Sequence, residues 1–240
     1  MTYKTKGIII KRTNLGEADR ILTIFTDKFG KIKAVAKGVR KPLSKLAGNL
    51  ELFCLGHFLL AEGRSLDIVA GAEVEKCYFN LRNSLKATQT AFYLAEIIDK
   101  MTEEKEPHPE IFDLLDNSLE NLGKDQNKLL VSYFEINFLS ESGFNPELYK
   151  CLSCGKKTIS ENNYFSFSSG GLLCDKCRSV DGLKISDESI KILRLFLKHR
   201  ISVIDKLKTE IKLSKEIGQI TRGYLKYTID KELKSERFLQ

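Results

Sequence analysis

The heptapeptide KIKAVAK, residues 31–37, alternates apolar and mostly charged side chains. Successive side chains of a β-strand point to opposite faces, so Ile32, Ala34 and Ala36 are predicted to face a core. The lysines of the same strand are predicted to lie on the opposite face. This stretch therefore predicts a strand with one buried and one largely cationic face.

Similar short segments lie on both sides of this strand. They are rich in apolar and β-branched residues and cover 6–13, 20–27, 50–61 and 65–75. Turn signals separate them, among them Phe29-Gly30-Lys31 and the hairpin turn Glu62-Gly63-Arg64. Five strands within residues 1–77 fit a small barrel such as the OB-fold. A generic five-stranded sheet or an SH3-like barrel would give the same pattern.

From Tyr78 onward the apolar spacing changes to the three- and four-residue steps of helices. The predicted helical segments are 81–99, 111–122, 126–140, a helix that Ser186 caps, and 208–229. The fold class is therefore predicted as α+β. An N-terminal five-stranded OB-fold barrel, residues 1–77, precedes an α-helical C-terminal domain, residues 78–240.

Four of the six cysteines form two CxxC pairs, Cys151 with Cys154 and Cys174 with Cys177. Two such turns supply the four thiolates of a tetrahedral zinc site, and four thiolates leave no open position for catalysis. We predict one structural Zn²⁺ in a ribbon inserted at residues 148–182. Thiol exchange is the alternative use of CxxC, but it requires a βαβ setting that these flanks lack. Cys54 and Cys77 are predicted to be separate buried core thiols.

The chain carries a net charge of +7, which is unevenly distributed. Residues 1–50 hold twelve Lys or Arg against three acids, residues 51–183 thirteen against twenty-one, and residues 184–240 fourteen against eight. No apolar run reaches the roughly 18 residues of a membrane span, and the run Ile8–Ile10 is too short for a signal peptide. A cytoplasmic protein with a basic N-terminal region aimed at phosphate is predicted. A solvated surface is the alternative.

The sequence KGVRKPLSK, residues 37–45, forms the densest cluster of cations and is called the basic loop below. Gly38 and Pro42 mark it as an exposed turn, and several cations side by side can neutralise phosphates. The predicted nucleic-acid contacts are Lys37, Arg40, Lys41 and Lys45, together with Lys31 and Lys33 of the preceding strand. Tyr3, Phe25 and Phe29 are candidates to stack on bases, with core packing as the alternative for each.

The chain has none of the common catalytic motifs, such as a phosphate loop, HExxH or GxSxG. The acidic pair Glu17 and Asp19 is interpreted as a cap or as a salt-bridge partner of Arg20 rather than as an acid/base pair. The predicted function is therefore binding rather than catalysis.

The predicted helix 208–229 has an apolar face and an opposite basic stripe. Lys215, Arg222 and Lys226 lie on that stripe, which is either a solvated outer face or the rim of a groove. An apolar groove with a basic rim suits an acidic, apolar peptide tail.

Six stretches, in order along nearly the whole chain, resemble the bacterial RecO family of recombination mediators. They are Thr5–Ile9, Gly16–Ile21, Thr26–Lys31, Ala36–Ser44, Phe138–Pro146 and Gly170–Cys174. The resemblance implies an OB-fold, a helical domain and an inserted zinc ribbon. The presence of all four CxxC cysteines places the chain with the zinc-bearing members.

The resemblance also implies a function. RecO-like proteins bind single- and double-stranded DNA, anneal strands coated by single-stranded DNA-binding protein, and act with RecR and often RecF to load RecA. They do not catalyse the making or breaking of covalent bonds. When bound to DNA, the chain would be associated with the nucleoid. By this resemblance the DNA-contacting loop would be Lys37, Arg40 and Lys41, with Lys45 beside it. In some members the contact with the tail of single-stranded DNA-binding protein lies on the helical domain, and the stripe of Lys215, Arg222 and Lys226 is the candidate rim for it, although no motif places that pocket.

Two other classes of protein would share the same charge and cysteines. An RNA- or ribosome-associated OB-fold protein with a zinc ribbon is the first alternative. A zinc or thiol enzyme is the second, and it would carry an accessible reactive thiol.

Overall fold

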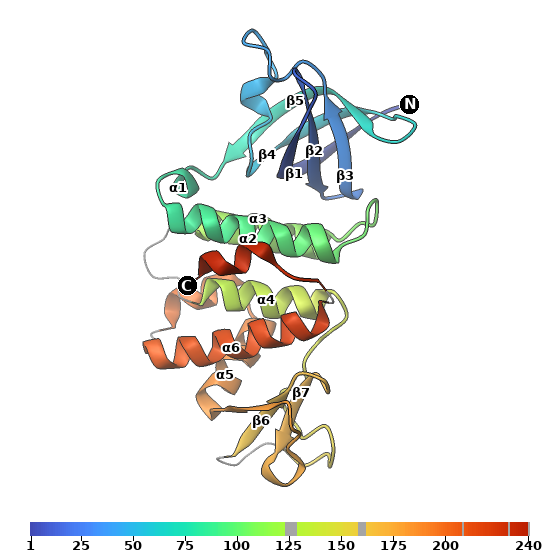
Figure 1. Cartoon of the computed structure of the whole chain (residues 1–240). Coiled ribbons are helices and arrows are strands. Elements are labelled where there is room, and N and C mark those ends of the chain that lie inside the picture. Colours follow the sequence, from blue (N-terminus) through green and yellow to red (C-terminus); the bar gives the residue numbers. More distant parts are fainter. Residues whose placement is uncertain (123–128, 158–161, 208, 230, 240) are drawn as a thin grey trace. The chain divides into compact units, whose positions relative to one another are not determined.

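The computed structural model describes residues 1–122, 129–157, 162–207, 209–229 and 231–239 (Figure 1). These residues form two compact units. Unit 1 comprises the described residues of Met1–Gly123 and Leu233–Gln240, and unit 2 those of Lys124–Glu232. No helix in the described ranges is long and apolar enough to cross a membrane.

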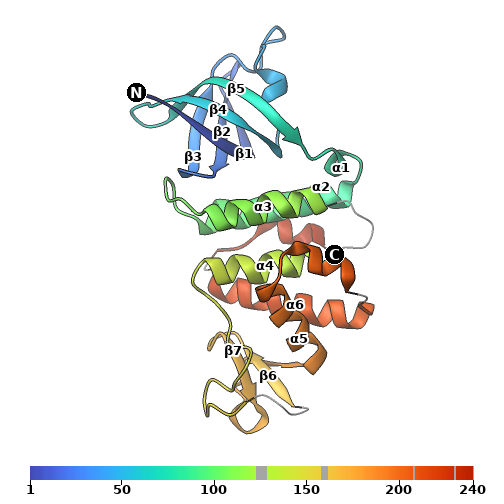
Figure 2. The ribbon, with the colours of Figure 1, turned by 180° about the vertical axis from the view of Figure 1, so that it is seen from behind.

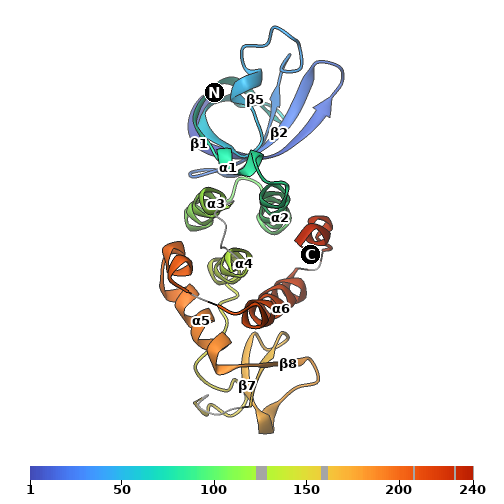
Figure 3. The ribbon, with the colours of Figure 1, turned by 90° about the vertical axis from the view of Figure 1, so that its left-hand side faces the viewer.

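Unit 1 starts with a closed barrel whose strand order is β1-β2-β3-β5-β4. The strands are β1 Thr2–Leu15, β2 Asp19–Thr26, β3 Gly30–Ala36, β4 Cys54–Ala61 and β5 Asp67–Cys77. Neighbouring strands are antiparallel except β3 and β5, and the long strand β1 closes the barrel by pairing with both β2 and β4. Figure 3 shows the strands curving around a common interior. The predicted N-terminal five-stranded barrel is confirmed.

The barrel interior is apolar, as the alternation in residues 31–37 predicts. Ile32, Ala34 and Ala36 are at most 1% exposed and pack in one cluster with side chains from the other strands. Gly30 begins β3 with φ +63°, and a Cβ there would lie 1.9 Å from the carbonyl oxygen of Glu106. Glycine is therefore required at this position, because the loop that carries Glu106 passes too close to leave room for a side chain.

Helices α1 Phe79–Arg82, α2 Leu85–Met101 and α3 Pro109–Asn121 follow the barrel in unit 1. The predicted single helix from Leu81 is wrong, because Ser84 is extended and its side chain accepts a hydrogen bond from the backbone N–H of Ala87, which starts α2. Helices α2 and α3 lie against the barrel, as Figure 2 shows from behind. The C-terminal 3₁₀ segment η4 Lys234–Leu239 packs on α2. The compact unit thus extends beyond the barrel, whose last strand ends at the predicted boundary, Cys77.

Unit 2 consists of three helices and a small sheet. The helices are α4 Leu130–Glu141, α5 Asp187–Lys198 and α6 Ile211–Thr228, with the 3₁₀ segment η3 Ile201–Lys206 between the last two. The strands are β6 Asn163–Ser166, β7 Gly171–Cys174 and β8 Gly182–Ile185, in the order β7-β6-β8, with the 3₁₀ turn η2 Asp175–Cys177 after β7. The predicted cap is confirmed, because Ser186 accepts a hydrogen bond from the Ser189 backbone N–H. The predicted helix starts at Gln126 and Lys208 lie outside the described residues.

Lys31 does not face solvent. Its side chain is 7% exposed, and its ammonium donates to the carbonyl oxygens of Asp99, in a short bond, and of Thr102, at 2.7 Å. These carbonyls belong to the end of α2, where a cation also suits the helix dipole. The prediction of Lys31 as a phosphate contact is wrong, because strand alternation cannot show that a helix covers the outer face.

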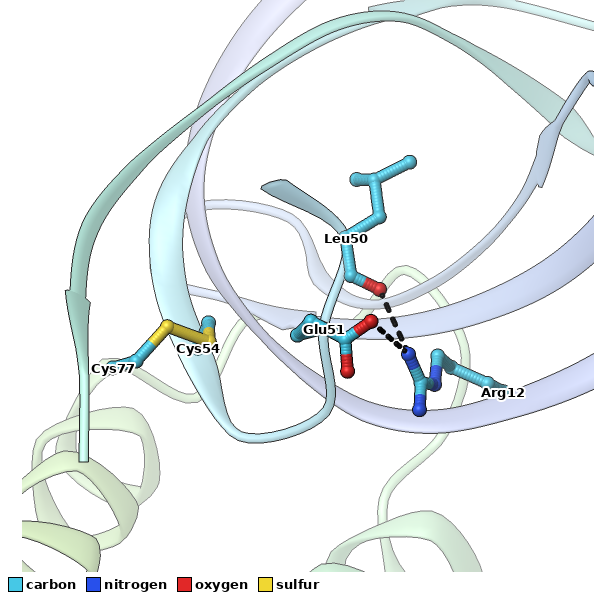
Figure 4. Close-up of a disulfide and its surroundings, with 5 residues drawn as sticks. All are labelled: Arg12, Leu50, Glu51, Cys54 and Cys77. Atoms are coloured by element: carbon cyan, nitrogen blue, oxygen red, sulfur yellow. Dashed lines mark hydrogen bonds and ion pairs between the residues drawn. A yellow bond between two sulfur atoms is a disulfide. The ribbon is translucent and has the colours of Figure 1, made fainter. Parts of the chain in front are cut away.

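Cys54 and Cys77 form a disulfide, so the prediction of two separate core thiols is also wrong. The residues are directly opposite each other in the β4–β5 ladder, and their Cα atoms are 4.3 Å apart. Figure 4 shows the bond beside the Arg12–Glu51 ion pair, whose Nη1 and Oε1 are 2.9 Å apart. Arg12 also donates to the carbonyl oxygen of Leu50, so two links fix the chain just before β4.

Candidate metal centre and nucleic-acid interface

The four-cysteine cluster (Cys151, Cys154, Cys174 and Cys177) lies in unit 2, where two distant turns meet. The first pair occupies the turn before β6, while Cys174 ends β7 and Cys177 ends the following 3₁₀ turn. The four sulfur atoms lie within 4.8 Å of one another. The sequence prediction that these four side chains converge is confirmed.

Backbone hydrogen bonds shape the first turn. The N–H of Gly155 donates to the Cys151 carbonyl at 2.9 Å, and the N–H of Cys151 donates to the Lys156 carbonyl at 2.8 Å. Gly155 has φ +71°, a conformation that glycine adopts without strain. The N–H of Leu152 donates to the Leu172 carbonyl of β7 at 2.9 Å, which ties the first CxxC turn to the strand that carries Cys174.

The electrostatics of the cluster suit a cation. Burial opposes ionisation of Cys151, but backbone N–H groups of Cys154, Cys174 and Ser153 outweigh it and lower the pKa of the thiol to about 6. A hydrogen bond from Ser153 favours the Cys177 thiolate, yet the neighbouring cysteine side chains raise the pKa of that thiol to about 11. Four thiolates this close repel one another unless a bound cation offsets their charge.

The spacing of the sulfur atoms also fits a metal ion. Metal–sulfur bonds of about 2.3 Å in a tetrahedron place the sulfur atoms about 3.8 Å apart. The Sγ atoms of Cys154 and Cys174 are 3.9 Å apart. The four sulfur atoms are therefore spaced closely enough to bind one metal ion.

The basic loop follows β3, and the turn between β1 and β2 orders its first residues. The carboxylate of Asp19 accepts a hydrogen bond from the Gly38 N–H at 2.7 Å, and the carbonyl of Ala18 accepts one from the Arg40 N–H at 2.9 Å. Arg40 Nη1 also donates to the Gly16 carbonyl at 2.8 Å. Asp19 therefore accepts from a backbone N–H, as a capping residue does, but that N–H belongs to a distant turn that the sequence did not indicate.

The cations of this region divide into two groups. Lys33 pairs with Glu104 in a short contact, and Lys6, Lys11 and Arg12 also pair with acids of unit 1. Lys37, Lys41 and Lys45 are exposed and form no ion pair among the described residues. The positive charge that reaches solvent is therefore concentrated in the basic loop.

The three aromatic candidates have different environments. Phe25 is fully buried and its ring lies 6.2 Å from that of Phe112, so the stacking prediction is wrong for Phe25. Phe29 is 38% exposed and packs against Tyr3, with ring centroids 4.8 Å apart. Tyr3 also donates to Asp67 at 2.5 Å, and its burial together with that carboxylate raises the pKa of the phenol.

The predicted basic stripe on α6 is interrupted. Lys215 and Lys226 are exposed, but Arg222 Nε lies 3.6 Å from Oε1 of Glu135, whose side chain on α4 is fully buried. Thr221 donates to the other carboxylate oxygen of Glu135 at 2.5 Å. Arg222 therefore joins two helices of unit 2 and is only half-exposed, so Lys215 and Lys226 are the more accessible cations of the predicted stripe.

Models of two protein families match the chain. The model described as "Recombination protein O N terminal" matches residues 1–78, and "Recombination protein O C terminal" matches residues 82–237. The chain belongs to the RecO family. The resemblance predicted from six sequence stretches is confirmed, and the match favours that hypothesis over the RNA- or ribosome-associated one.

Curated RecO relatives align along almost the whole chain. The DNA repair protein RecO of Dehalococcoides mccartyi is 39% identical over 97% of this chain and 93% of its own length. The DNA repair protein RecO of Acetivibrio thermocellus is 35% identical over 100% of this chain and 97% of its own. That of Alkaliphilus metalliredigens is 34% identical over 96% and 95%. Both units of the chain therefore have counterparts in RecO proteins.

Proposed function

We propose that this RecO-family chain is a DNA repair and recombination mediator that binds single- and double-stranded DNA and anneals complementary strands. Its basic loop contacts the sugar-phosphate backbone and makes no base-specific contacts. The reaction needs no bond-making step, so the chain acts as a binding protein rather than as an enzyme.

One observation carries this proposal: the basic loop presents cations that no acid of the described residues neutralises. Its start is ordered by Asp19 and Ala18, so the backbone at the start of the loop is already placed before DNA arrives. Ordered cations lose less conformational entropy on binding. Lys31 is excluded from this interface by its burial, and Lys33 contributes only if phosphate displaces Glu104.

Charge reversal at Lys37, Lys41 and Lys45 tests the interface. Each phosphate contact to single-stranded DNA contributes about 0.7 to the slope of log affinity against log salt, so the triple Glu variant should lower the slope by about 2. Lys41→Glu is compared with Lys28→Glu, which is also exposed and lies in the β2–β3 turn at the opposite end of β3. Equal losses of DNA affinity in the two single variants would contradict the proposal.

Arg40 is a poorer probe than the lysines. Its guanidinium donates to the Gly16 carbonyl, so Arg40→Glu would disturb the loop as well as its charge. Arg40→Lys keeps the positive charge but replaces the planar guanidinium, which has several N–H donors, by a single ammonium group. Weaker binding by Arg40→Lys at low salt would identify a positioning contribution of Arg40 to the loop.

The partners proposed from the family resemblance are RecR, often RecF, and the C-terminal tail of single-stranded DNA-binding protein. The chain would help RecA to load on coated single strands in the cytoplasm, on the nucleoid. Lys215 and Lys226 remain the candidates for the basic rim that meets the acidic tail. Annealing of strands coated by the full-length protein is compared with strands coated by a tail-deleted form. Equal annealing rates would exclude the tail contact.

The metal ion proposed for the four-cysteine cluster is Zn²⁺, in a structural role. Bound there, it supplies a closed tetrahedral link between the two CxxC turns. Metal analysis of the purified chain should give one zinc per chain, and chelation should release four reactive thiols together. Reactive thiols in the metal-loaded cluster would instead support the thiol-enzyme hypothesis.

A further inference from the structure

The disulfide between Cys54 and Cys77 joins two strand ends where the barrel meets its helices. Phe53 precedes Cys54 and packs edge to face on Phe92 of α2, with ring centroids 5.1 Å apart. On the other side, Lys76 pairs with Asp116 of α3 at 2.8 Å, and Tyr78 donates to the same carboxylate at 2.8 Å. Residues adjacent to both cysteines therefore hold the two helices.

The two cysteines differ in access. Cys54 is 2% exposed, whereas Cys77 is partly exposed and lines a surface cavity of about 170 Å³. Apolar side chains such as Phe53, Leu81 and Phe92 also line the cavity, and Arg82 and Glu51 lie in its wall. A small thiol can enter such a cavity and meet the sulfur of Cys77 before that of Cys54.

We propose that Cys54 and Cys77 form a reversible dithiol–disulfide centre that small thiols open and close through this cavity. The inference is independent of the proposed DNA function. In the reducing cytoplasm proposed above, disulfides are typically transient or redox-sensing, and an accessible one exchanges with the thiol pool.

The exchange proceeds in two balanced steps with a small thiol as reductant. A thiolate attacks Cys77 Sγ, a mixed disulfide forms there, and Cys54 Sγ leaves as a thiolate that takes up a proton. A second thiolate attacks the sulfur of the bound small thiol, and Cys77 leaves as a thiolate and is protonated. Two electrons pass from two small thiols to the protein, and the small disulfide is released.

Reduction removes the covalent link but leaves the β4–β5 ladder in place. The expected effect is a looser junction between the barrel and α2 and α3, because the residues that hold those helices flank the two cysteines. The difference in Tm between oxidised and reduced chain should be on the order of 10 °C.

A thiol titration of the full, metal-loaded chain tests the centre. The chain is equilibrated in glutathione buffers of increasing reducing strength, quenched with acid and labelled with a maleimide that adds mass. Two thiols should become labelled together, and the Cys54→Ser/Cys77→Ser variant should lose this step while keeping the thiols of the four-cysteine cluster. The centre is refuted if both thiols stay labelled under oxidising glutathione, or if reduction requires denaturant.

Two single variants test the point of entry. In Cys54→Ser the remaining Cys77 thiol should react with an aromatic disulfide reagent at least about tenfold faster than the Cys54 thiol of Cys77→Ser. In the unchanged chain, mass analysis after a brief pulse of glutathione should find the adduct on Cys77. Equal reactivity of the two thiols, or an adduct on Cys54, would overturn the assigned route. The adduct is measured in the unchanged chain, so this test holds even if one of the variants folds poorly.

Discussion

Glu96 on α2 fixes the C-terminal segment of the chain to unit 1, across a separation of more than a hundred residues. Its carboxylate accepts hydrogen bonds from the backbone N–H of Lys234 at 3.1 Å and of Ser235 at 2.7 Å, and a short one from the Ser235 hydroxyl. Lys100, one helical turn away, lies 3.1 Å from the same side chain. We predict that Glu96→Gln releases η4 from α2.

The magnitude follows from the charge on Glu96. Partial burial by itself would raise its pKa, but the hydrogen bonds from Ser235 and Lys234 and the Lys100 ammonium lower the pKa from 4.5 to about 2. A shift of this size corresponds to about 3.4 kcal/mol, and the 17% exposure of the side chain and solvent screening reduce it to about 1.5–2 kcal/mol. Glutamine lacks the charge, and its NH₂ group faces donors rather than acceptors.

The same shift sets the pH dependence. Because the folded-state pKa lies below the unfolded one, the stabilisation is fully present above the unfolded value and is lost as pH falls through the folded value. Attachment of η4 should therefore be constant near pH 7 and should weaken between about pH 5 and pH 2. The Glu96→Gln chain should show a flatter dependence over this window.

The rate of amide hydrogen exchange at Ser235 tests this prediction directly, because the Ser235 N–H donates to Glu96. A loss of 1.5–2 kcal/mol makes exchange about 10- to 30-fold faster at neutral pH. Glu103→Gln is the matched control, since Glu103 is exposed just after α2, and it should change exchange less than about twofold. Unchanged protection of Ser235 in Glu96→Gln would refute the reasoning.

Three further predictions concern other residues. Lys31→Met should destabilise unit 1 by about 1–3 kcal/mol, because the Asp99 and Thr102 carbonyls lose a donor, yet should leave DNA affinity unchanged in a binding titration. Arg222→Ala should cost about 3 kcal/mol in denaturant unfolding by leaving the buried Glu135 carboxylate without its cation, and adding Glu135→Gln should restore most of the loss. Removal of the metal by a chelator should abolish protection from hydrogen exchange in β6–β8 while the barrel stays protected.

Properties set by residues close in the sequence were predictable. The two CxxC turns specify their own geometry, so the four-cysteine cluster required only that the two turns meet. The barrel strands followed from alternation, and the Ser186 cap from its position before an apolar face. The attachment of η4 to Glu96 was not predictable, because it depends on a chain return that leaves no local pattern.

The Cys54–Cys77 disulfide could not be predicted from the sequence because it depends on the register of the β4–β5 ladder. At the hairpin end, Ala61 pairs with Ile68, and counting back in simple register from there would pair Cys54 with Glu75. Two irregularities in the ladder, at Leu59/Leu60 and at Leu55/Gly56, each shift the pairing by one residue and bring Cys77 opposite Cys54. The cysteines thus became partners through two bulges that composition does not reveal.

The charge of the first fifty residues illustrates how folding changes the meaning of a sequence count. Twelve cations against three acids suggest a broad positive surface. Among the described residues, five of those cations pair with four acids from later in the chain, Glu51, Glu75, Asp99 and Glu104. Of the seven that remain, four lie in the basic loop. The field that reaches DNA is therefore smaller than the count implies but more localised, so reversal of a few loop charges should remove most of the salt-dependent affinity.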